Sequence, residues 1–337
     1  MQFPKISEYV KASQDASDNL GMSTKATIAE FNESIMDEFG VKYSKDGRKL
    51  LKAPQNLDGT YSIKEGVRII CNNAFWGCCS LTDIVIPDSV TSIGDKAFYR
   101  CSSLTSFVIP NGVTRIGTWT FLGCSSLKEV AIPDSVTSIG DGAFASCLSL
   151  SNIVIPDGVT SIGDGAFWNC SSFLIKYISI PKSVICLNGN PFVKWEGKLE
   201  CLSPNFIYED DVLFNKDKSK IISFRNKAVK SYIIPSSVTS IGNSAFAGCT
   251  SLSNIAIPSS VNSIGDKAFW NCCSLNSIAI PDSVTSIGDG AFCGCSSLKY
   301  ISIPKNVICL NGNPFFNWYG KLECLSPNFI YEDDVLF

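Results

Sequence analysis

The chain has 337 residues, of which 45% are hydrophobic and 18% charged, and its 28 basic and 31 acidic side chains give a net charge of −3. This balance argues against a nucleic-acid-binding protein, which needs a basic excess, and against a disordered chain, which has fewer apolar residues. There is no histidine, so Ser-His-Asp and Cys-His catalytic groups and histidine-ligated metal sites are excluded.

The sequence predicts no membrane insertion. Its start, MQFPKISEY, lacks the basic residues and apolar core of a signal peptide, and no run of about 18 apolar residues predicts a transmembrane helix. The 16 cysteines are therefore expected to be reduced thiols rather than a disulfide framework.

Residues 1–40 differ from the rest of the chain and are predicted to be helical. One helix is expected to start at Ser23 or Thr24 and to stop at Gly40, because apolar residues follow helical spacing at Ile28, Phe31, Ile35 and Phe39. An earlier helix, suggested by Ile6, Tyr9 and Val10, would end near Gly21. We interpret this segment as a cap over the first coil of the array described below. The alternative is a tether or a partner-binding helix.

Residues 41–62 are predicted to form a β-hairpin that leads into the array. Residues 41–51 read VKYSKDGRKLL, and Asp46-Gly47 is a typical tight turn between two strands. The same pattern recurs at residues 212–222, VLFNKDKSKII, and begins again at residues 335–337.

From residue 63 onward the sequence repeats every 23 residues. Prolines mark the repeat at Pro87, Pro110, Pro133 and Pro156, then at Pro181 after 25 residues, and later at Pro235, Pro258, Pro281 and Pro304. Residues 132–144, IPDSVTSIGDGAF, are identical to residues 280–292. A fixed period of this length predicts a repeat solenoid, because one unit cannot bury its apolar face without stacked neighbours.

Each unit is predicted to hold two short extended pieces and one short helical turn. In residues 81–101, Ile84-Val85-Ile86 alternates as a half-buried strand does, and Pro87 ends it. Asp95 is the expected N-cap of the helical turn, residues 96–101. Equivalent phenylalanines are expected to stack as an inner spine: Phe75, Phe98, Phe121, Phe144, Phe167, Phe246, Phe269 and Phe292.

The repeats fall into a first array, residues 63–198, and a second array, residues 227–337, separated by a hairpin insertion at residues 199–226. Residues 181–214 match residues 304–337 almost completely, 123 positions later, so a larger repeat overlies the small one. The chain stops within a predicted hairpin strand. We therefore expect either a truncated longer array or an end that pairs with the last coil. An exposed edge there would favour end-to-end self-association.

The motif IPDSVTSIGDxAFxxCSSL resembles the repeat of the BspA-like leucine-rich repeat family, and the similarity covers about residues 41–337. The resemblance implies a leucine-rich-repeat-like, right-handed superhelix of short parallel strands with β-hairpin insertions. It also implies adhesion to host or matrix proteins and a cell-surface or secreted location. The sequence departs from that pattern because it shows no export signal and no anchor.

Two columns of residues allow chemical as well as structural roles. Cysteines recur at Cys78, Cys101, Cys124, Cys147, Cys170, Cys249, Cys272 and Cys295. We interpret them as buried thiols, the alternative being a zinc or redox site. Carboxylates recur at Asp95, Asp141, Asp164, Asp266 and Asp289. We interpret these as turn caps, the alternatives being acid–base chemistry or calcium binding. No catalytic, cofactor-binding or metal-binding residue is assigned.

Exposed aromatic residues are the predicted contacts for a partner. Tryptophan and tyrosine are favoured interface anchors, and the turns carry them beside the spine phenylalanines. The predicted contacts are Trp76, Tyr99, Trp119, Trp168 and Trp270 on the turns, with Tyr177 and Tyr300 on the strands. The alternative is that these rings shield the turns by packing on their neighbours.

The sequence therefore predicts a non-catalytic binding solenoid without a cofactor, whose partner is a protein or a glycan. Nearly interchangeable residues spread along a rod differ from the single set of unlike residues that an enzyme gathers in one pocket. The alternatives are an intracellular structural scaffold and, less favoured, a thiol- or metal-dependent enzyme.

Overall fold

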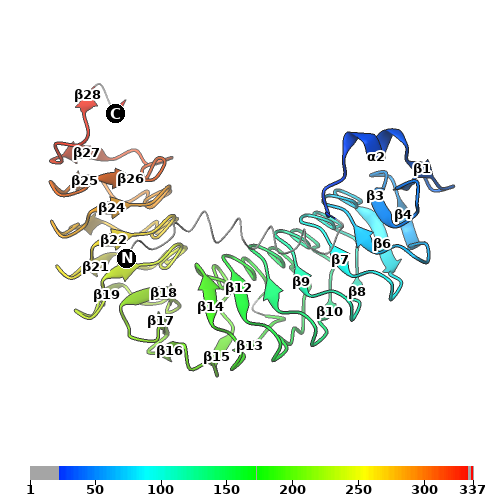
Figure 1. Cartoon of the computed structure of the whole chain (residues 1–337). Helices are drawn as coiled ribbons and strands as arrows, with labels where there is room; N and C mark the ends of the chain where they lie inside the picture. Colours follow the sequence, from blue (N-terminus) through cyan, green and yellow to red (C-terminus); the bar gives the residue numbers. More distant parts are fainter. Residues whose placement is uncertain (1–22, 172, 333–334, 337) are drawn as a thin grey trace, which may run out of the picture.

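The computed structural model describes residues 23–171, 173–332 and 335–336, and it is a stack of coils that follows a curved path (Figure 1). Strands of successive coils pair in parallel with a 23-residue offset. Ser138 pairs with Ser161, and Ile139 pairs with Ile162. Equivalent residues of the repeat therefore lie directly above one another, which confirms the predicted repeat solenoid.

Two rows of short strands run along the stack. The first row contains β4 (Asp58–Ser62), β6 (Ser80–Val85), β8 (Ser106–Val108), β10 (Glu129–Ala131), β13 (Tyr177–Ile180), β15 (Lys198–Cys201), β19 (Ser231–Ile233), β21 (Asn254–Ala256), β23 (Ser277–Ile278), β25 (Tyr300–Ile303) and β27 (Lys321–Cys324). Within β6, Ile84 is buried and Val85 is exposed, as the predicted alternation requires. The first row thus turns alternate residues into the core and the others to the surface.

The second row carries the shorter strands of each unit. It contains β3 (Lys49–Lys52), β5 (Ile69–Ile70), β7 (Ser92–Ile93), β9 (Arg115–Ile116), β11 (Ser138–Ile139), β12 (Ser161–Gly163), β14 (Cys186–Asn188), β18 (Lys220–Phe224), β20 (Ser240–Ile241), β22 (Ser263–Ile264), β24 (Ser286–Ile287) and β26 (Cys309–Leu310). The isoleucine in most of these strands points into the core.

The turn that follows the second row is not the short helical turn that the sequence predicted. The Lys96 N–H donates to Thr118 O in the next coil at 2.9 Å, whereas the Ala97 N–H donates to Gly94 O in its own turn at 3.2 Å. This alternation continues along the segment, so successive N–H groups donate alternately to the next coil and to a carbonyl of the same coil. An α-helix would keep these bonds within one coil and leave the next coil without donors.

The inner spine of phenylalanines is confirmed. All eight predicted rings are fully buried, and successive rings stack nearly parallel, for example 5.5 Å between the centroids of Phe121 and Phe144 at an interplanar angle of 5°. Phe192 continues the first stack at 6.0 Å, and Phe224 begins the second. The spine is therefore two stacks, one in each array.

Each array begins with an antiparallel hairpin. β2 (Lys42–Tyr43) pairs with β3 ahead of the first array, and β17 (Val212–Asn215) pairs with β18 ahead of the second. β16 (Phe206–Glu209) adds a further antiparallel strand beside β17. The second-row sheet ends at β14 and a new sheet starts at β16. The path of the stack bends at this break (Figure 1).

The segment before the first hairpin is only partly helical. Helix α2 (Ile28–Asn32) starts at Thr27, whose hydroxyl and backbone form a capping box with Glu30. The prediction of one helix from Ser23 or Thr24 to Gly40 is wrong, because β1 (Ile35–Met36) follows α2 and pairs antiparallel with β2. The apolar side chains at helical spacing, Ile28, Phe31, Ile35 and Phe39, are exposed rather than packed on a core.

The remaining termini add little to the array. The earlier predicted helix, which ends near Gly21, lies outside the described residues. An ion pair of 2.8 Å between Lys49 and Glu30 holds α2 beside β3. The role of residues 1–40 as a cap, a tether or a partner-binding helix stays a prediction. At the other end, β28 (Tyr331–Glu332) pairs antiparallel with β29 (Val335–Leu336), as the start of a further hairpin would. No helix of the described residues has the length and apolar character needed to cross a membrane.

Candidate functional site

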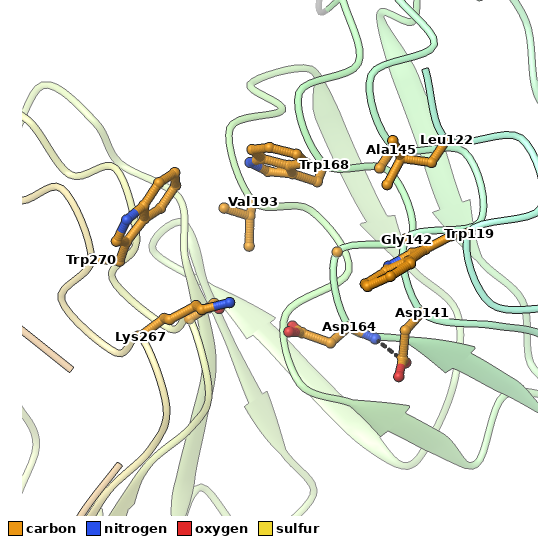
Figure 2. Close-up of a pocket in the computed structure, with 12 residues that line it drawn as sticks. Trp119, Leu122, Asp141, Gly142, Ala145, Asp164, Trp168, Val193, Lys267 and Trp270 are labelled. Carbon is orange, nitrogen blue, oxygen red and sulfur yellow. Dashed lines mark hydrogen bonds between the residues drawn. The ribbon is translucent and has the colours of Figure 1, made fainter. Parts of the chain in front are cut away.

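The bend brings turns of the two arrays face to face around a pocket of about 460 Å³ (Figure 2). Trp119 and Trp168 come from the first array, and Trp270 comes from the second. The ring centroids of Trp168 and Trp270 are 6.4 Å apart in an edge-to-face arrangement. Leu122, Ala145 and Val193 complete the apolar wall. Three of the seven predicted contact residues thus meet in one pocket.

The polar side of the pocket carries charges of both signs. Asp141 and Asp164 come from successive coils of the first array, and Lys267 comes from the second array. The Lys267 ammonium points towards the Asp164 carboxylate across the pocket (Figure 2). Among the ion pairs of the described residues there is none between these two groups. A ligand placed between them would therefore find a hydrogen-bond acceptor on one side and a donor on the other.

Asp164 is held in place by the stack itself. Its Oδ1 accepts a hydrogen bond of 2.8 Å from the Asn190 N–H in the next coil, and its own N–H donates to Asp141 Oδ1 at 2.9 Å. Burial raises the pKa of Asp164 to about 6, since the hydrogen bond from Asn190 and the charge of Lys267 only partly offset the loss of water. The carboxylate is consequently rigid and poorly solvated, as a binding group should be.

Lysines of the array cover two of the three tryptophan rings. The Lys96 ammonium lies 4.6 Å from the centroid of the Trp119 ring, and the Lys194 ammonium lies 4.7 Å from that of Trp270. Such cation–π contacts orient a ring without closing both of its faces.

Specific contacts across the bend fix the geometry of the pocket. The Asn190 side chain donates to Ser244 O at 2.9 Å and so joins the two arrays at the pocket, which Ser244 helps to line. Arg225, which follows β18, places its guanidinium carbon 4.6 Å from the centroid of the Trp195 ring. It also donates to Gly197 O at 2.7 Å. The bend is therefore a packed interface with directional bonds.

Trp119 adopts a backbone conformation that is unusual for its size. Its φ is +56°, in the left-handed region that favours glycine. The equivalent residue of the next coil is Gly142, and a Cβ there would lie only 2.5 Å from Trp119 Cδ1. The indole thus lies over a position that only glycine can occupy, and the two residues form one wall of the pocket.

Two other predicted contacts form a separate cluster near the start of the first array. The rings of Trp76 and Tyr99 meet edge to face with centroids 6.2 Å apart. The Lys52 ammonium lies 5.5 Å from the centroid of the Trp76 ring, and the Arg100 guanidinium lies 5.3 Å from that of Tyr99. The structure does not bring this pair into the pocket at the bend.

The two predicted strand tyrosines occupy equivalent places in the two arrays. Tyr177 on β13 donates to Glu200, and Tyr300 on β25 donates to Glu323. These hydrogen bonds raise the pKa of both phenols and lower the pKa of both carboxylates. Both rings are 45% exposed and stay available on the strand face, away from the tryptophans of the bend.

The aspartate column joins coils instead of capping helical turns. Asp95 Oδ1 accepts from the Thr118 N–H at 2.8 Å, and Asp266 Oδ1 accepts from the Asp289 N–H at 2.8 Å, each in the next coil. Asn243 makes the same bond to Asp266 at 3.0 Å without a charge. The predicted N-cap role of Asp95 is therefore wrong, although the structural interpretation of the column holds.

The cysteine column is a row of free, buried thiols. Most of them donate to the spine phenylalanine of the preceding coil, as Cys124 does to Phe98 O at 3.1 Å and Cys147 does to Phe121 O at 3.2 Å. Burial raises the pKa of Cys124 to about 12. The described residues contain no group of histidine, cysteine and acidic side chains arranged to hold a metal ion.

Cys249, the first thiol of the second array, differs from the rest of the column. The Lys227 ammonium lies 3.1 Å from its Sγ and also donates to Ala247 O at 3.0 Å. Burial acts to raise its pKa, but the hydrogen bond from Cys272 and the Lys227 charge outweigh burial and lower it to about 7. The ammonium also donates at 3.2 Å to Phe224 O, the spine carbonyl of the preceding coil, whose equivalents accept hydrogen bonds from other thiols of the column.

Sequence reasoning missed two residues of the pocket, one cationic and one apolar. Lys267 and Val193 carried no sequence signal, because their positions hold other residues in neighbouring units. Asp164 belonged to a recognised column, yet only the bend turns it towards a cation. The one available signal was the hairpin insertion, which marks a break in the array but not its angle.

The model of the BspA-type leucine-rich repeat region matches residues 60–197 and 220–328, in six copies. A leucine-rich cell surface protein of Faecalibacterium prausnitzii is similar in structure, with 27% sequence identity and a TM-score of 0.61, over 86% of this chain and 94% of that one. A leucine-rich repeat protein of Eubacterium ventriosum is 26% identical with a TM-score of 0.53, over 83% of this chain and 69% of that one.

The pneumococcal vaccine antigen PcpA shares the fold, at 22% identity and a TM-score of 0.61, over 88% of this chain and 82% of that one. A search of curated proteins finds no match.

Proposed function

Because the chain belongs to the BspA-type leucine-rich repeat family, we propose that it is a non-catalytic binding solenoid that holds a protein partner at its bend. The observation that carries the proposal is the meeting of Trp119, Trp168 and Trp270 from two arrays in one pocket. Semi-exposed tryptophans in a pocket are the anchors that dominate binding at protein interfaces. Extended solenoid surfaces are used for such binding.

The proposal includes an adhesion role at a cell surface. Its support is the similarity to a bacterial protein described as a leucine-rich cell surface protein. We include host or matrix proteins among the proposed partners. End-to-end self-association through the last coil, which the sequence also predicts, stays a prediction.

Binding of the purified chain to an array of matrix and cell-surface proteins tests this function. The double variant Trp168→Ala, Trp270→Ala is expected to lose the partners that the natural chain binds. Tyr319→Ala removes a fully exposed ring at the far end of the stack and is expected to leave binding unchanged. If the partners bind the double variant as tightly as they bind the natural chain, the binding site does not lie at the bend.

The alternative of an intracellular scaffold makes a different prediction. Protease added to intact cells that produce the chain should digest a surface adhesin and spare a scaffold. Complete protection, together with no binding to any surface protein, would replace the adhesion proposal with the scaffold.

A further inference from the structure

We propose that the pocket at the bend binds a neutral pyranose ring, presented by a free glycan or by the glycan of a glycoprotein. This inference rests on the proposed function, since it names the chemistry that the bend recognises on its partner. The site would recognise the same sugar ring whether the glycan is free or attached to a protein.

The aromatic wall suits a sugar ring. A pyranose has apolar faces of C–H bonds and a rim of hydroxyl groups, so it stacks on an indole while its rim makes hydrogen bonds. Trp168 and Trp270 meet edge to face and leave ring surface facing the pocket (Figure 2). The volume of about 460 Å³ lies within the range of about 300–1,000 Å³ that small-molecule sites occupy.

The charges around the pocket favour a neutral ligand. Asp141 and Asp164 contribute two negative charges, while Lys267 and Lys194, whose ammonium lies on the Trp270 ring, contribute two positive charges. A cationic side chain would meet the lysines, and an anionic one would meet the carboxylates. A hydroxyl group avoids both penalties, because it can donate to Asp164 and accept from Lys267.

The stack leaves the choice of side chain at position 119 open. The equivalent positions of other coils hold Gly142, Gly165 and Gly290 but also Lys96, Ser244 and Lys267, all at positive φ. The stack therefore does not need an indole at position 119.

The repeat supplies matched replacements for three pocket residues. Trp119→Gly copies Gly142, and Trp168→Ala copies Ala145. Asp164→Asn copies Asn243, which keeps the bond to the next coil. Because the neighbouring coils already accept these residues, loss of binding in such variants is not explained by loss of folding.

Screening the purified chain on a glycan array, followed by calorimetric titration of the best free oligosaccharide, tests the proposal. We expect Trp168→Ala and Trp119→Gly each to weaken binding at least tenfold, and Tyr319→Ala to leave it unchanged. A glycoprotein partner is then measured before and after enzymatic removal of its glycans, which distinguishes the two sources of the sugar.

The pH dependence of oligosaccharide affinity is a second measurement, and a purely structural role of Asp164 would not change it. Asp164 faces Lys267 from the second array, Asp141 from the preceding coil and the Asn190 N–H from the next coil. An ionised carboxylate is the stronger acceptor. Affinity for the oligosaccharide should therefore fall about tenfold between pH 7.5 and pH 5, and Asp164→Asn should abolish this dependence.

The outcomes separate the two proposals. If a protein partner binds equally well after deglycosylation, and Trp168→Ala still abolishes that binding, the bend is a protein site and the pyranose is overturned. If no oligosaccharide binds, or if binding survives every pocket variant, the pyranose proposal fails at this site. If protein partners also bind every pocket variant, then both the pyranose proposal and the proposal of a protein-binding site at the bend fail.

Discussion

At the scale of single residues, Asp164 serves both the stack and the pocket. Its carboxylate bonds to the next coil, so the fold requires an acceptor there, but burial opposes the negative charge. Asn243 meets the same structural need without a charge in another coil. The charge at position 164 is therefore not explained by the needs of the stack.

The first prediction concerns this charge. The pKa of Asp164 is about 6 in the fold and about 3.9 in an unfolded chain, so the native state holds a proton that the unfolded state releases between these values. Stability consequently falls as pH rises from about 4 to 6. Two pH units correspond to about 3 kcal/mol, which partial solvent screening reduces to about 2 kcal/mol.

Asp164→Asn should therefore raise the free energy of unfolding by about 2 kcal/mol at pH 7.5 and leave it nearly unchanged at pH 4. Urea denaturation at the two pH values measures this. An equal effect at both pH values would show that the carboxylate is not destabilised by burial.

The second prediction concerns Trp119. Trp119→Gly removes the left-handed strain of about 1–2 kcal/mol but also removes indole packing and makes the unfolded chain more flexible. Because Trp119 is 40% exposed, these effects should nearly cancel, and the free energy of unfolding should change by less than about 1 kcal/mol. A loss above about 2 kcal/mol would make Trp119 a structural residue. Thermal unfolding followed by circular dichroism gives the value.

The third prediction concerns the thiol pair that begins the second array. Against the effect of burial, Cys272 and the charge of Lys227 lower the pKa of Cys249 to about 7, so the pair should release one proton near pH 7, while Cys124 stays a thiol up to a pKa of about 12. Thiolate absorbance, taken as the difference between the natural chain and Cys249→Ala, should show a step near pH 7. Lys227→Gln should move this step to higher pH, and an unmoved step would exclude the lysine as its cause.

At the scale of the elements, the sequence predicted the strands and the spine but not the turns. Two sequence patterns follow directly from which residues are buried, and both could therefore be predicted. They are the alternation of Ile84 and Val85 in a strand and the 23-residue spacing of the phenylalanines. The turn of residues 96–101 has bonds to residues three positions back, which is also the signature of a helical turn. Only the neighbouring coil reveals that alternate N–H groups point out of the turn.

The fourth prediction tests the spine. Phe144 is fully buried between Phe121 and Phe167, at centroid distances of 5.5 and 5.9 Å. Phe144→Ala should lower the free energy of unfolding by about 3–5 kcal/mol through the cavity it leaves, and Phe144→Leu by much less. Phe173, which is 88% exposed, is the control, and its replacement by alanine should cost under about 0.5 kcal/mol. Equal effects at both positions would contradict a stacked core.

At the scale of the whole molecule, a comparison of equivalent residues in the two arrays shows which surface of the first array the second array buries. Val193 is 6% exposed at the bend, whereas Phe316, its counterpart 123 residues later, is 65% exposed. Trp195 is likewise fully buried, but its counterpart Trp318 is only partly buried. The second array, through Arg225 and its hairpin, therefore covers a surface that is left open at the last coil.

The sequence predicted two arrays and the hairpin between them, but it could not predict the pocket. Local periodicity fixes which residues stack within an array, since each coil repeats the last. The angle between arrays depends on single contacts such as Asn190 to Ser244 and Arg225 to Gly197, which have no periodic signature. The aromatic residues were therefore recognised as separate contacts, and their meeting was not.

The fifth prediction tests the meeting of the two arrays most directly. The chain has six tryptophans, so uniform 5-fluorotryptophan labelling gives six ¹⁹F resonances that single substitutions assign. Because the Trp168 and Trp270 centroids lie 6.4 Å apart, Trp270→Ala should shift the Trp168 resonance, and Trp76→Ala should leave that resonance in place. A Trp168 resonance that does not respond to the loss of Trp270 would mean that the arrays do not meet, and the pocket at the bend would have to be abandoned.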